Sequence, residues 1–251
     1  MSQSATFRKL APMIWQESKD PSVYGFFELD VTEIADKEMI LPRFLSTLNA
    51  MVLNHPELNS MIRFGRAVQR KKQMISVMVN IPDNKNADLS ALTFDVCKDL
   101  TSVDLKEIIL GKGQLIRSRK DPYLGNALKL LHYLPRPLAK IFLKIYITLI
   151  YDFDTRLGIR FVPKYPFGSV IVSNVGSLGI KKALLPLVSL ARPAMLLSLG
   201  KATPEARVIN NQICIREIAH IGVTFDHRLF DGSHAAKMLN YFENHFEKND
   251  L

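Results

Sequence analysis

The chain has 251 residues, of which 47% are hydrophobic and 23% are charged, and these proportions exclude a disordered or fibrous protein. The length is that of one large domain or two small ones, and it allows a sizeable core without disulfides. Lysine and arginine number 33 against 24 acidic residues, and the formal charge of +9 favours an anionic partner such as a phosphorylated ligand, an acidic protein, a nucleic acid or a membrane surface.

The N-terminal part of the chain alternates between helical and strand patterns. Leu41, Leu45 and Leu48 recur at helical spacing, and this helix is expected to stop at Asn54-His55-Pro56, because the residue before a proline avoids the helical conformation. Apolar and polar residues alternate from Ile75 to Ile81, which predicts a strand that we expect to pair with Met61–Phe64. The other predicted elements are a helix over Leu10–Lys19, a turn at Asp20-Pro21-Ser22, a strand over Phe26–Thr32 and a polar loop over Pro82–Asp88.

The C-terminal part mixes helices and strands without strict alternation. A helix is predicted over Ser102–Lys120, and two helices over Ala127–Tyr151 are expected to break at Pro135-Arg136-Pro137. The remaining predicted elements are a strand over Phe167–Ser173, a loop over Asn174–Gly179, a hairpin over Arg207–Ile215, a strand over Ile218–Phe225 and a helix over Ser233–Lys248. This order favours an α+β protein, with a sheet covered by helices.

The longest apolar stretch, Ala127–Phe153, does not predict a membrane span. Basic residues and a proline interrupt it, and its longest uncharged run, Ile145–Tyr151, is far shorter than the roughly 20 residues that a spanning helix needs. Met1–Thr6 lacks the apolar core of a signal peptide. The two cysteines, Cys97 and Cys214, are too few for a disulfide framework and fit a reducing compartment. We therefore expect a soluble, cytoplasmic protein.

The segment Asp226–Gly232 (DHRLFDG) is the strongest candidate for chemistry. His227 continues the apolar row of the preceding strand, and Asp231 and Gly232 form the turn before the last helix, where Asp231 or Ser233 is expected to be the cap. A histidine at the mouth of an apolar surface is typical of a general base, but a surface histidine beside a capping aspartate explains the same pattern. A metal site made of His227, Asp231 and His234 is the weaker alternative, because the turn at Gly232 interrupts their helical spacing.

Several motifs give the chain a family resemblance. DHRLFDG resembles the DHR-x-x-DG signature of the dihydrolipoamide acyltransferases, which are the catalytic cores of 2-oxoacid dehydrogenase complexes, and is similar to the H-x-x-x-D-G of chloramphenicol acetyltransferases. Phe167–Gly179 resembles the strand and loop that carry a serine–asparagine pair in those cores. Further similar segments follow the same order, namely Arg8-Lys9, Glu28–Thr32, Asn54–Asn59 and Ala194–Gly200. The resemblance therefore extends over nearly the whole chain.

This resemblance implies a chloramphenicol acetyltransferase-like mixed sheet covered by helices, as one catalytic domain over residues 1–251. The chain departs from the family pattern in three ways. No lipoyl or peripheral-subunit-binding domain is expected before the catalytic region, and Pro82–Thr101 lacks the usual apolar stretch. A basic helical insertion, at about residues 121–163, has no counterpart in the family.

The resemblance also assigns roles to individual residues. His227 matches the general base, Ser173 matches the serine that donates a hydrogen bond to the oxyanion, and Asp231 matches the aspartate that shapes the turn. Arg8 matches an arginine that pairs with that aspartate, and a solvated terminal arginine is nearly as good an interpretation. Asn174 is expected to support the loop, and Gly232 the turn. The family forms trimers with the site between subunits, so a homotrimer with His227 and Ser173 on different chains is implied.

The resulting prediction is a stand-alone acyltransferase. It would move an acyl group from acyl-CoA or an acyl carrier protein to a thiol, hydroxyl or amine, with coenzyme A thioester as cosubstrate and no bound cofactor or metal. The alternatives are a dihydrolipoamide acyltransferase core of a 2-oxoacid dehydrogenase complex and a catalytically silent scaffold trimer. The basic cluster Arg66, Arg70, Lys71 and Lys72 is typical of a solvated hairpin edge, and no nucleic-acid partner is predicted.

The basic helical insertion has two interpretations, as a segment that packs on the domain or as a surface that binds a partner. In a helix, Leu138, Phe142, Ile145 and Leu149 fall on one face, and the simplest interpretation is that this face packs on the domain. A membrane surface or an acidic carrier is the functional alternative for these basic helices, and a membrane partner is not predicted.

Overall fold

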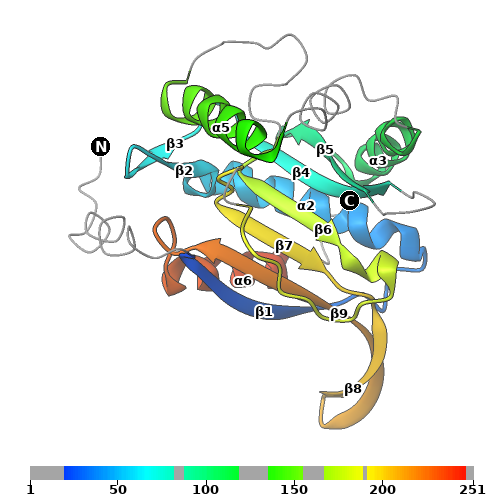
Figure 1. Cartoon of the computed structure of the whole chain (residues 1–251). Coiled ribbons are helices and arrows are strands. Elements are labelled where there is room, and N and C mark those ends of the chain that lie inside the picture. The colour runs from blue at the N-terminus through cyan, green and yellow to red at the C-terminus, as the bar shows by residue number, and fades with distance from the viewer. Residues whose placement is uncertain (1–19, 82–87, 119–134, 155–166, 189–190, 247–251) are drawn as a thin grey trace.

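The computed structural model of the chain describes residues 20–81, 88–118, 135–154, 167–188 and 191–246. Within these residues the centre is a mixed seven-stranded sheet of order β1-β9-β7-β6-β4-β5, in which β8 also pairs with β9 (Figure 1). The strands are β1 (Ser22–Asp30), β4 (Met74–Ile81), β5 (Asp88–Asp95), β6 (Val170–Asn174), β7 (Met195–Leu199), β8 (Thr203–Ile209) and β9 (Gln212–Asp226). β6 runs parallel to β4 and β7, and the other pairs are antiparallel. The expected α+β architecture is confirmed.

In the described part of the chain, three helices cover one face of the sheet: α2 (Ile40–Asn54), α3 (Ser102–Arg117) and α6 (Gly232–His245). The apolar stripe of α2 is buried, and the ring of Phe44 stacks on that of Phe242 in α6 with centroids 5.2 Å apart. α2 ends at Asn54, as its following proline predicts. α3 begins with a capping box, because Thr101 and Asp104 each accept a backbone hydrogen bond from the other. Short 3-10 turns are η1 (Lys37–Met39), η2 (Pro56–Asn59) and η4 (Val175–Leu178).

Residues 180–188 cross the opposite face of the sheet without regular structure. Ser198 Oγ donates to the Ala183 carbonyl at 2.5 Å, and Thr224 Oγ1 donates to the Leu185 carbonyl at 2.6 Å. Gly222 makes this approach possible, since a Cβ at that position would overlap the Ala183 carbonyl oxygen. The segment thus substitutes for a helix layer.

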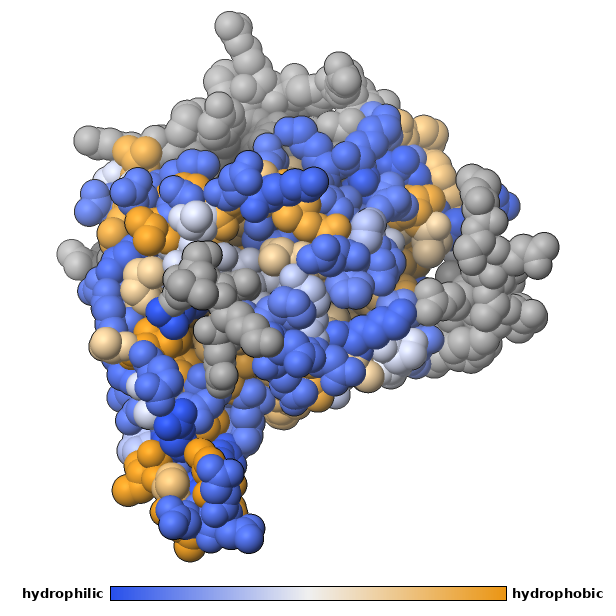
Figure 2. Space-filling model, turned by 180° about the vertical axis from the view of Figure 1, so that it is seen from behind, coloured by the Kyte–Doolittle hydropathy of each residue, from blue (hydrophilic) through white to orange (hydrophobic). Residues whose placement is uncertain are grey.

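β8 and the first half of β9 leave the body of the protein as a two-stranded arm (Figure 1). The turn at Asn210 and Asn211 has φ angles of 50° and 61°, which asparagine tolerates better than most residues, and the predicted hairpin is confirmed. The predicted strand Ile218–Phe225 is the second half of the same fifteen-residue β9. One face of the arm is apolar and exposed, and its residues are Ala206, Val208, Ile213 and Ile215. Figure 2 shows the hydrophobic side chains along this protrusion.

The predicted pairing of Ile75–Ile81 with Met61–Phe64 is wrong. β2 (Ser60–Arg63) and β3 (Arg66–Gln69) form their own two-stranded ribbon, and β4 lies between β5 and β6. Ile75, for example, is opposite Val170. Local strand patterns do not reveal partners that are this far apart in sequence. β5, which follows the polar loop, is absent from the predicted elements.

The described part of the predicted insertion is helical, with α5 (Arg136–Ile147) followed by a π-helical turn, η3 (Thr148–Asp152). The expectation that Leu138 and Ile145 face the body is wrong, since these side chains are 53% and 55% exposed. The inner side of this segment instead contributes Tyr146, Ile147, Ile150 and Tyr151, which pack on Met61 and Val68 of β2 and β3. α5 is apolar on more than one side, so its sequence does not specify which side is buried. The predicted helix over residues 10–19, Arg8, and the first helix of the insertion lie outside the described residues.

Among the described residues, none of the helices combines the length and the hydropathy that crossing a bilayer requires.

Candidate active site

His227 lies one residue beyond the end of β9. Ala219, Ile221, Val223 and Phe225 face the helix layer, and all four are buried. His227 continues this row, as the strand periodicity predicts, and its side chain is half-buried. Its backbone N–H donates to the Pro21 carbonyl at 2.9 Å, which ties the loop to the start of β1.

The hydrogen bond of the His227 ring defines its tautomer. Nδ1 lies 2.7 Å from the carbonyl oxygen of Phe230. A carbonyl oxygen accepts hydrogen bonds and cannot donate, so Nδ1 carries the proton in the neutral ring. Nε2 is then the nitrogen with the lone pair, and it is the atom able to take a proton from a substrate.

An apolar pocket of about 270 Å³ opens beside His227, between β1 and α6. Its walls include Phe26, Phe225, Phe230 and Leu239. A pocket that is mostly apolar and carries one basic nitrogen suits an uncharged substrate segment, such as an acyl chain or a thioester arm.

Asp231 is the N-cap of α6, as predicted. Its carboxylate accepts hydrogen bonds from the backbone N–H and the hydroxyl of Ser233, at 3.0 and 2.6 Å, and His234 Nδ1 lies 2.7 Å from the same oxygen. The hydrogen bond from the Ser233 hydroxyl, followed by those from His234, holds the pKa of Asp231 well below its ordinary value. Gly232, the first residue of α6, is exposed. The contacts of Asp231 and His234 therefore serve the helix start and do not gather with His227 into a set of metal ligands.

Ser173 and Asn174 end β6, where Ser173 is half-buried. The Asn174 side chain accepts a hydrogen bond from the backbone N–H of Ser177 at 3.2 Å, and the Ser177 hydroxyl donates to the Asn174 carbonyl at 2.7 Å. Asn174 therefore orders the turn that follows Ser173.

One copy of the chain does not bring Ser173 and His227 together. Ser173 is opposite Ser198 in β7, which is opposite Gly222 in β9, five positions before His227. Two strand spacings and five residues along a strand separate the two backbones by roughly 20 Å. Ser173 also shares the sheet face of Ile171, which residues 180–188 cover, whereas His227 continues the row on the helix side. A site that uses both residues needs a second copy of the chain.

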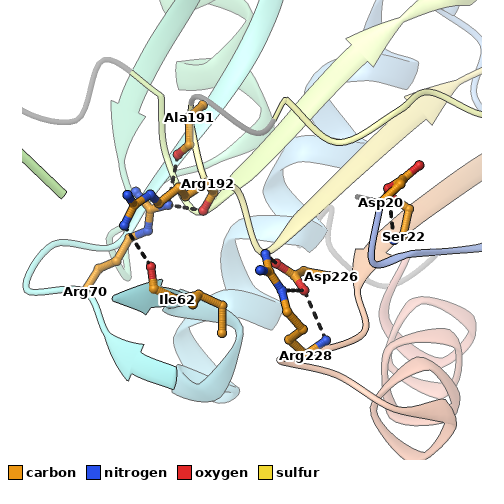
Figure 3. A network of polar contacts seen from close by, with 8 residues as sticks. All are labelled: Asp20, Ser22, Ile62, Arg70, Ala191, Arg192, Asp226 and Arg228. Atoms are coloured by element: carbon orange, nitrogen blue, oxygen red, sulfur yellow. Dashed lines mark hydrogen bonds and ion pairs between the residues drawn. The ribbon is translucent and has the colours of Figure 1, made fainter. Parts of the chain in front are cut away.

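A polar network includes Asp226 and Arg228, the two residues that flank His227 in the sequence (Figure 3). Arg228 binds the buried Asp226 with two hydrogen bonds of 2.9 and 2.7 Å. Close by, Arg70 donates to the carbonyls of Ala191 and Arg192 at 3.2 and 2.5 Å. The expectation of a solvated Arg70 is wrong, since only 6% of it is exposed. These backbone acceptors come from residues more than a hundred positions away, so the local basic pattern could not reveal the burial.

Sequence reasoning missed a cluster at the base of the arm, where ligand atoms of Glu28, Glu205 and His220 lie within 4.8 Å of one another. His220 is 2% exposed, and its Nε2 lies 2.7 Å from a Glu205 oxygen, whose hydrogen bond lowers the pKa of Glu205. Arg207 binds both carboxylates, at 2.5 and 3.0 Å. Because the guanidinium already supplies positive charge, this cluster is an ion-pair network that joins the arm to β1.

Comparison with known proteins places this geometry in a family context. Residues 166–251 match the model of the family described as 2-oxoacid dehydrogenases acyltransferase (catalytic domain). The C-terminal third thus matches an acyltransferase catalytic domain. This region contains Ser173, Asn174, His227, Asp231 and Gly232, and the family resemblance noted in the sequence is confirmed. The match says nothing of residues before 166.

One curated relative is the dihydrolipoyllysine-residue acetyltransferase component of the pyruvate dehydrogenase complex of Zymomonas mobilis. It is 34% identical over 85 residues, which are 34% of this chain and 19% of that protein. The matched segment thus spans about a fifth of that relative's length.

Solved structures extend the likeness of the fold to the whole chain. A probable dihydrolipoamide acetyltransferase of Listeria monocytogenes has a TM-score of 0.64 at 14% identity, over 100% of this chain and 97% of that one. The dihydrolipoamide acetyltransferase of Azotobacter vinelandii has a TM-score of 0.65 at 16% identity, over 92% of this chain and 83% of that one. The fold expected from the resemblance is therefore confirmed.

Proposed function

We propose that this chain transfers an acyl group between the thiols of dihydrolipoamide and coenzyme A, as a 2-oxoacid dehydrogenase-type acyltransferase domain. The observation that supports this most strongly is the tautomer of His227, which presents the basic Nε2 beside an apolar pocket. A curated relative that matches 85 residues of this chain is named a dihydrolipoyllysine-residue acetyltransferase. This reaction was the alternative prediction, and the comparisons favour it over a reaction with an acyl carrier protein.

In the proposed reaction, His227 Nε2 takes the proton of the attacking thiol. The thiolate adds to the thioester carbonyl and forms a tetrahedral oxyanion. Collapse of this intermediate expels the thiolate of the original thioester, which takes the proton back from His227. The hydrogen bond from Nδ1 to Phe230 strengthens when the ring is charged, because the charged donor binds the carbonyl more tightly. The transfer is direct, and no covalent acyl-enzyme forms.

Ser173 of a neighbouring copy would donate its hydroxyl hydrogen to the oxyanion. The separation of roughly 20 Å within one chain supports a site shared between subunits. The arm supports assembly too, because Val208, Ile213 and Ile215 are 72%, 80% and 76% exposed on one of its faces. An isolated two-stranded ribbon is marginally stable, so such a face is expected to pack on a partner. We propose a trimer, with lipoyl domains as the substrate-bearing partners.

The solved Azotobacter vinelandii enzyme supports these assignments. That structure concerns the roles of a serine, a histidine and an asparagine in the catalytic mechanism, and its asparagine follows its histidine by four positions. Asp231 follows His227 by the same spacing, so an aspartate occupies the corresponding place here. Its hydrogen bonds to the start of α6 indicate a positioning role, which it fulfils by fixing the turn after His227.

One observation favours a different acyl acceptor. Arg192 joins Asp152 of η3 through two hydrogen bonds of 2.6 and 2.8 Å. These two residues line a cavity of about 650 Å³ together with Asp226 and Arg228, which flank His227. The predicted insertion thus contributes Asp152 to a wall near the base. The second candidate is therefore acyl transfer from acyl-CoA or an acyl carrier protein to another thiol, hydroxyl or amine.

The test is a thiol-release assay against a panel of acyl-CoAs, with and without dihydrolipoamide. Turnover that requires dihydrolipoamide supports the first candidate, and turnover with another acceptor alone supports the second. His227→Ala should lower the rate by about 10²–10⁴-fold. His245→Ala is the matched control, since its Nδ1 also faces a backbone carbonyl, at 2.9 Å, and it lies at the opposite end of α6 from the His227 loop. A fully folded wild-type protein without turnover on any pair would support the scaffold alternative.

A further inference from the structure

The outer side of α5 is an exposed surface that acyl transfer does not use. Leu138, Ile141 and Ile145 are 53%, 56% and 55% exposed. They occur at intervals of three and four residues, so they form one row along the helix. The opposite side of α5 and η3 is anchored, because Tyr146, Ile147 and Ile150 pack around Met61. The row of Leu138, Ile141 and Ile145 therefore faces the solvent.

The charges of α5 all have one sign. Lys140 and Lys144 are exposed and one helical turn apart, so they form a second row next to the aliphatic one. The helix contains one further basic residue, Arg136, and no aspartate or glutamate. An apolar row beside a lysine row is typical of a helix that lies in the interface of an anionic membrane.

The helix α3 provides a contrast within the same chain. It also exposes aliphatic side chains, among them Leu110, which is 52% exposed. Its sequence includes Asp104 and Glu107 as well as basic residues, so the attraction to an anionic surface is largely cancelled. Exposed leucine alone therefore does not distinguish α5, whereas aliphatic exposure combined with unopposed positive charge does.

We propose that α5 binds peripherally to an anionic lipid surface, with its aliphatic row at the headgroup boundary and its lysines among the phosphates. A bilayer interface accepts both rows without a shaped pocket, whereas an acidic protein would need a groove to cover the aliphatic row. Binding of this kind does not depend on the proposed acyl transfer.

The experiment is co-sedimentation of the intact protein with vesicles of phosphatidylcholine alone or mixed with phosphatidylglycerol. The wild-type protein should bind the mixed vesicles far better, and added salt should weaken this binding. Each lysine near an anionic surface is worth about fivefold in partitioning. Loss of one lysine and one aliphatic side chain in Ile141→Gln/Lys144→Gln should therefore reduce binding by roughly 25-fold. Leu110→Gln/Lys112→Gln in α3 makes the same chemical change on two exposed residues and should leave binding unchanged.

Three results would overturn the proposal: equal binding to the two kinds of vesicle, equal loss in the two double variants, or no loss in either. Circular dichroism and thermal unfolding verify that both variants are folded. Soluble poly-glutamate provides a test of the other class of partner. Binding to poly-glutamate that depends on α5, without binding to mixed vesicles, would assign the helix to an acidic protein and overturn the lipid assignment.

Discussion

Subunit complementation tests the shared site directly. His227→Ala removes the base and keeps Ser173, whereas Ser173→Ala removes the oxyanion donor and keeps His227. As homo-oligomers, the two variants should lose about 10²–10⁴-fold and about 10²–10³-fold in rate, respectively. Because roughly 20 Å separates the two residues within one chain, each shared site takes His227 from one subunit and Ser173 from another, and each variant removes only one of the two.

Mixed assemblies should regain activity. If the two variants are co-expressed with different tags at equal levels and assemble at random, each site draws its histidine from one subunit and its serine from the next. About a quarter of the sites then receive both intact residues, as follows from a heterologous interface. Purification on both tags removes the homotrimers, and in each remaining mixed trimer one of the three sites has both intact residues. The doubly purified mixture should therefore turn over at about a third of the wild-type rate, far above either parent.

The controls separate assembly from chemistry. Mixing the two proteins after purification, without subunit exchange, should restore nothing. Co-assembled protein that shows only the parental rates would refute the shared site, and so would a fully active monomer in light scattering.

Three further predictions concern stability and assembly. Asp231→Ala should destabilise the fold by about 0.5–2 kcal/mol in chemical unfolding through loss of the α6 cap, with Asp231→Asn close to wild type. The hydrogen bond from Ser233 lowers the pKa of Asp231. The ionised Asp231 therefore stabilises the fold at pH values above the ordinary carboxyl pKa, and this contribution is lost as the pH falls below that value. Equal acid sensitivity of wild type and Asp231→Ala would contradict this. Gly222→Ala should destabilise the fold by at least about 1–3 kcal/mol through overlap with the crossing segment, whereas Gly25→Ala, with open space at its Cβ, should unfold like wild type. Ile213→Asp, at a position that is 80% exposed, should dissociate the assembly in light scattering and leave the unfolding of each chain nearly unchanged.

The features that the sequence predicts well are those set by near neighbours along the chain. The alternation of apolar residues along β9 places His227 on the side of the strand that faces the helices. The position of Asp231 just before the last helix predicts that it is the N-cap of α6. Both follow from the geometry of a single strand or a single helix start. Family resemblance adds expected roles for Ser173 and Asn174, which stay predictions, whereas the local pattern alone indicates an ordinary strand end.

The features that the sequence does not predict depend on distant partners. β4 pairs with β6 across some ninety residues of chain, so proximity in sequence suggested the wrong neighbour. Arg70 is buried because backbone carbonyls of residues 191 and 192 accept its hydrogen bonds. The outward side of α5 depends on the position of Met61, which no periodicity encodes.

β9 connects the exposed arm with the loop that carries His227. At one end it forms the arm with its exposed apolar face, and His227 directly follows its other end. β1 pairs with nine of its fifteen residues, from Ile218 to Asp226, and β7 and β8 pair along its other edge. Because β9 is paired along both edges, we expect a displacement of the arm to be transmitted along the strand toward His227. Docking of the arm on a neighbouring subunit would thus help to fix the position of the His227 side chain. Substitutions in the arm would then change the alignment of His227 without contacting the substrate.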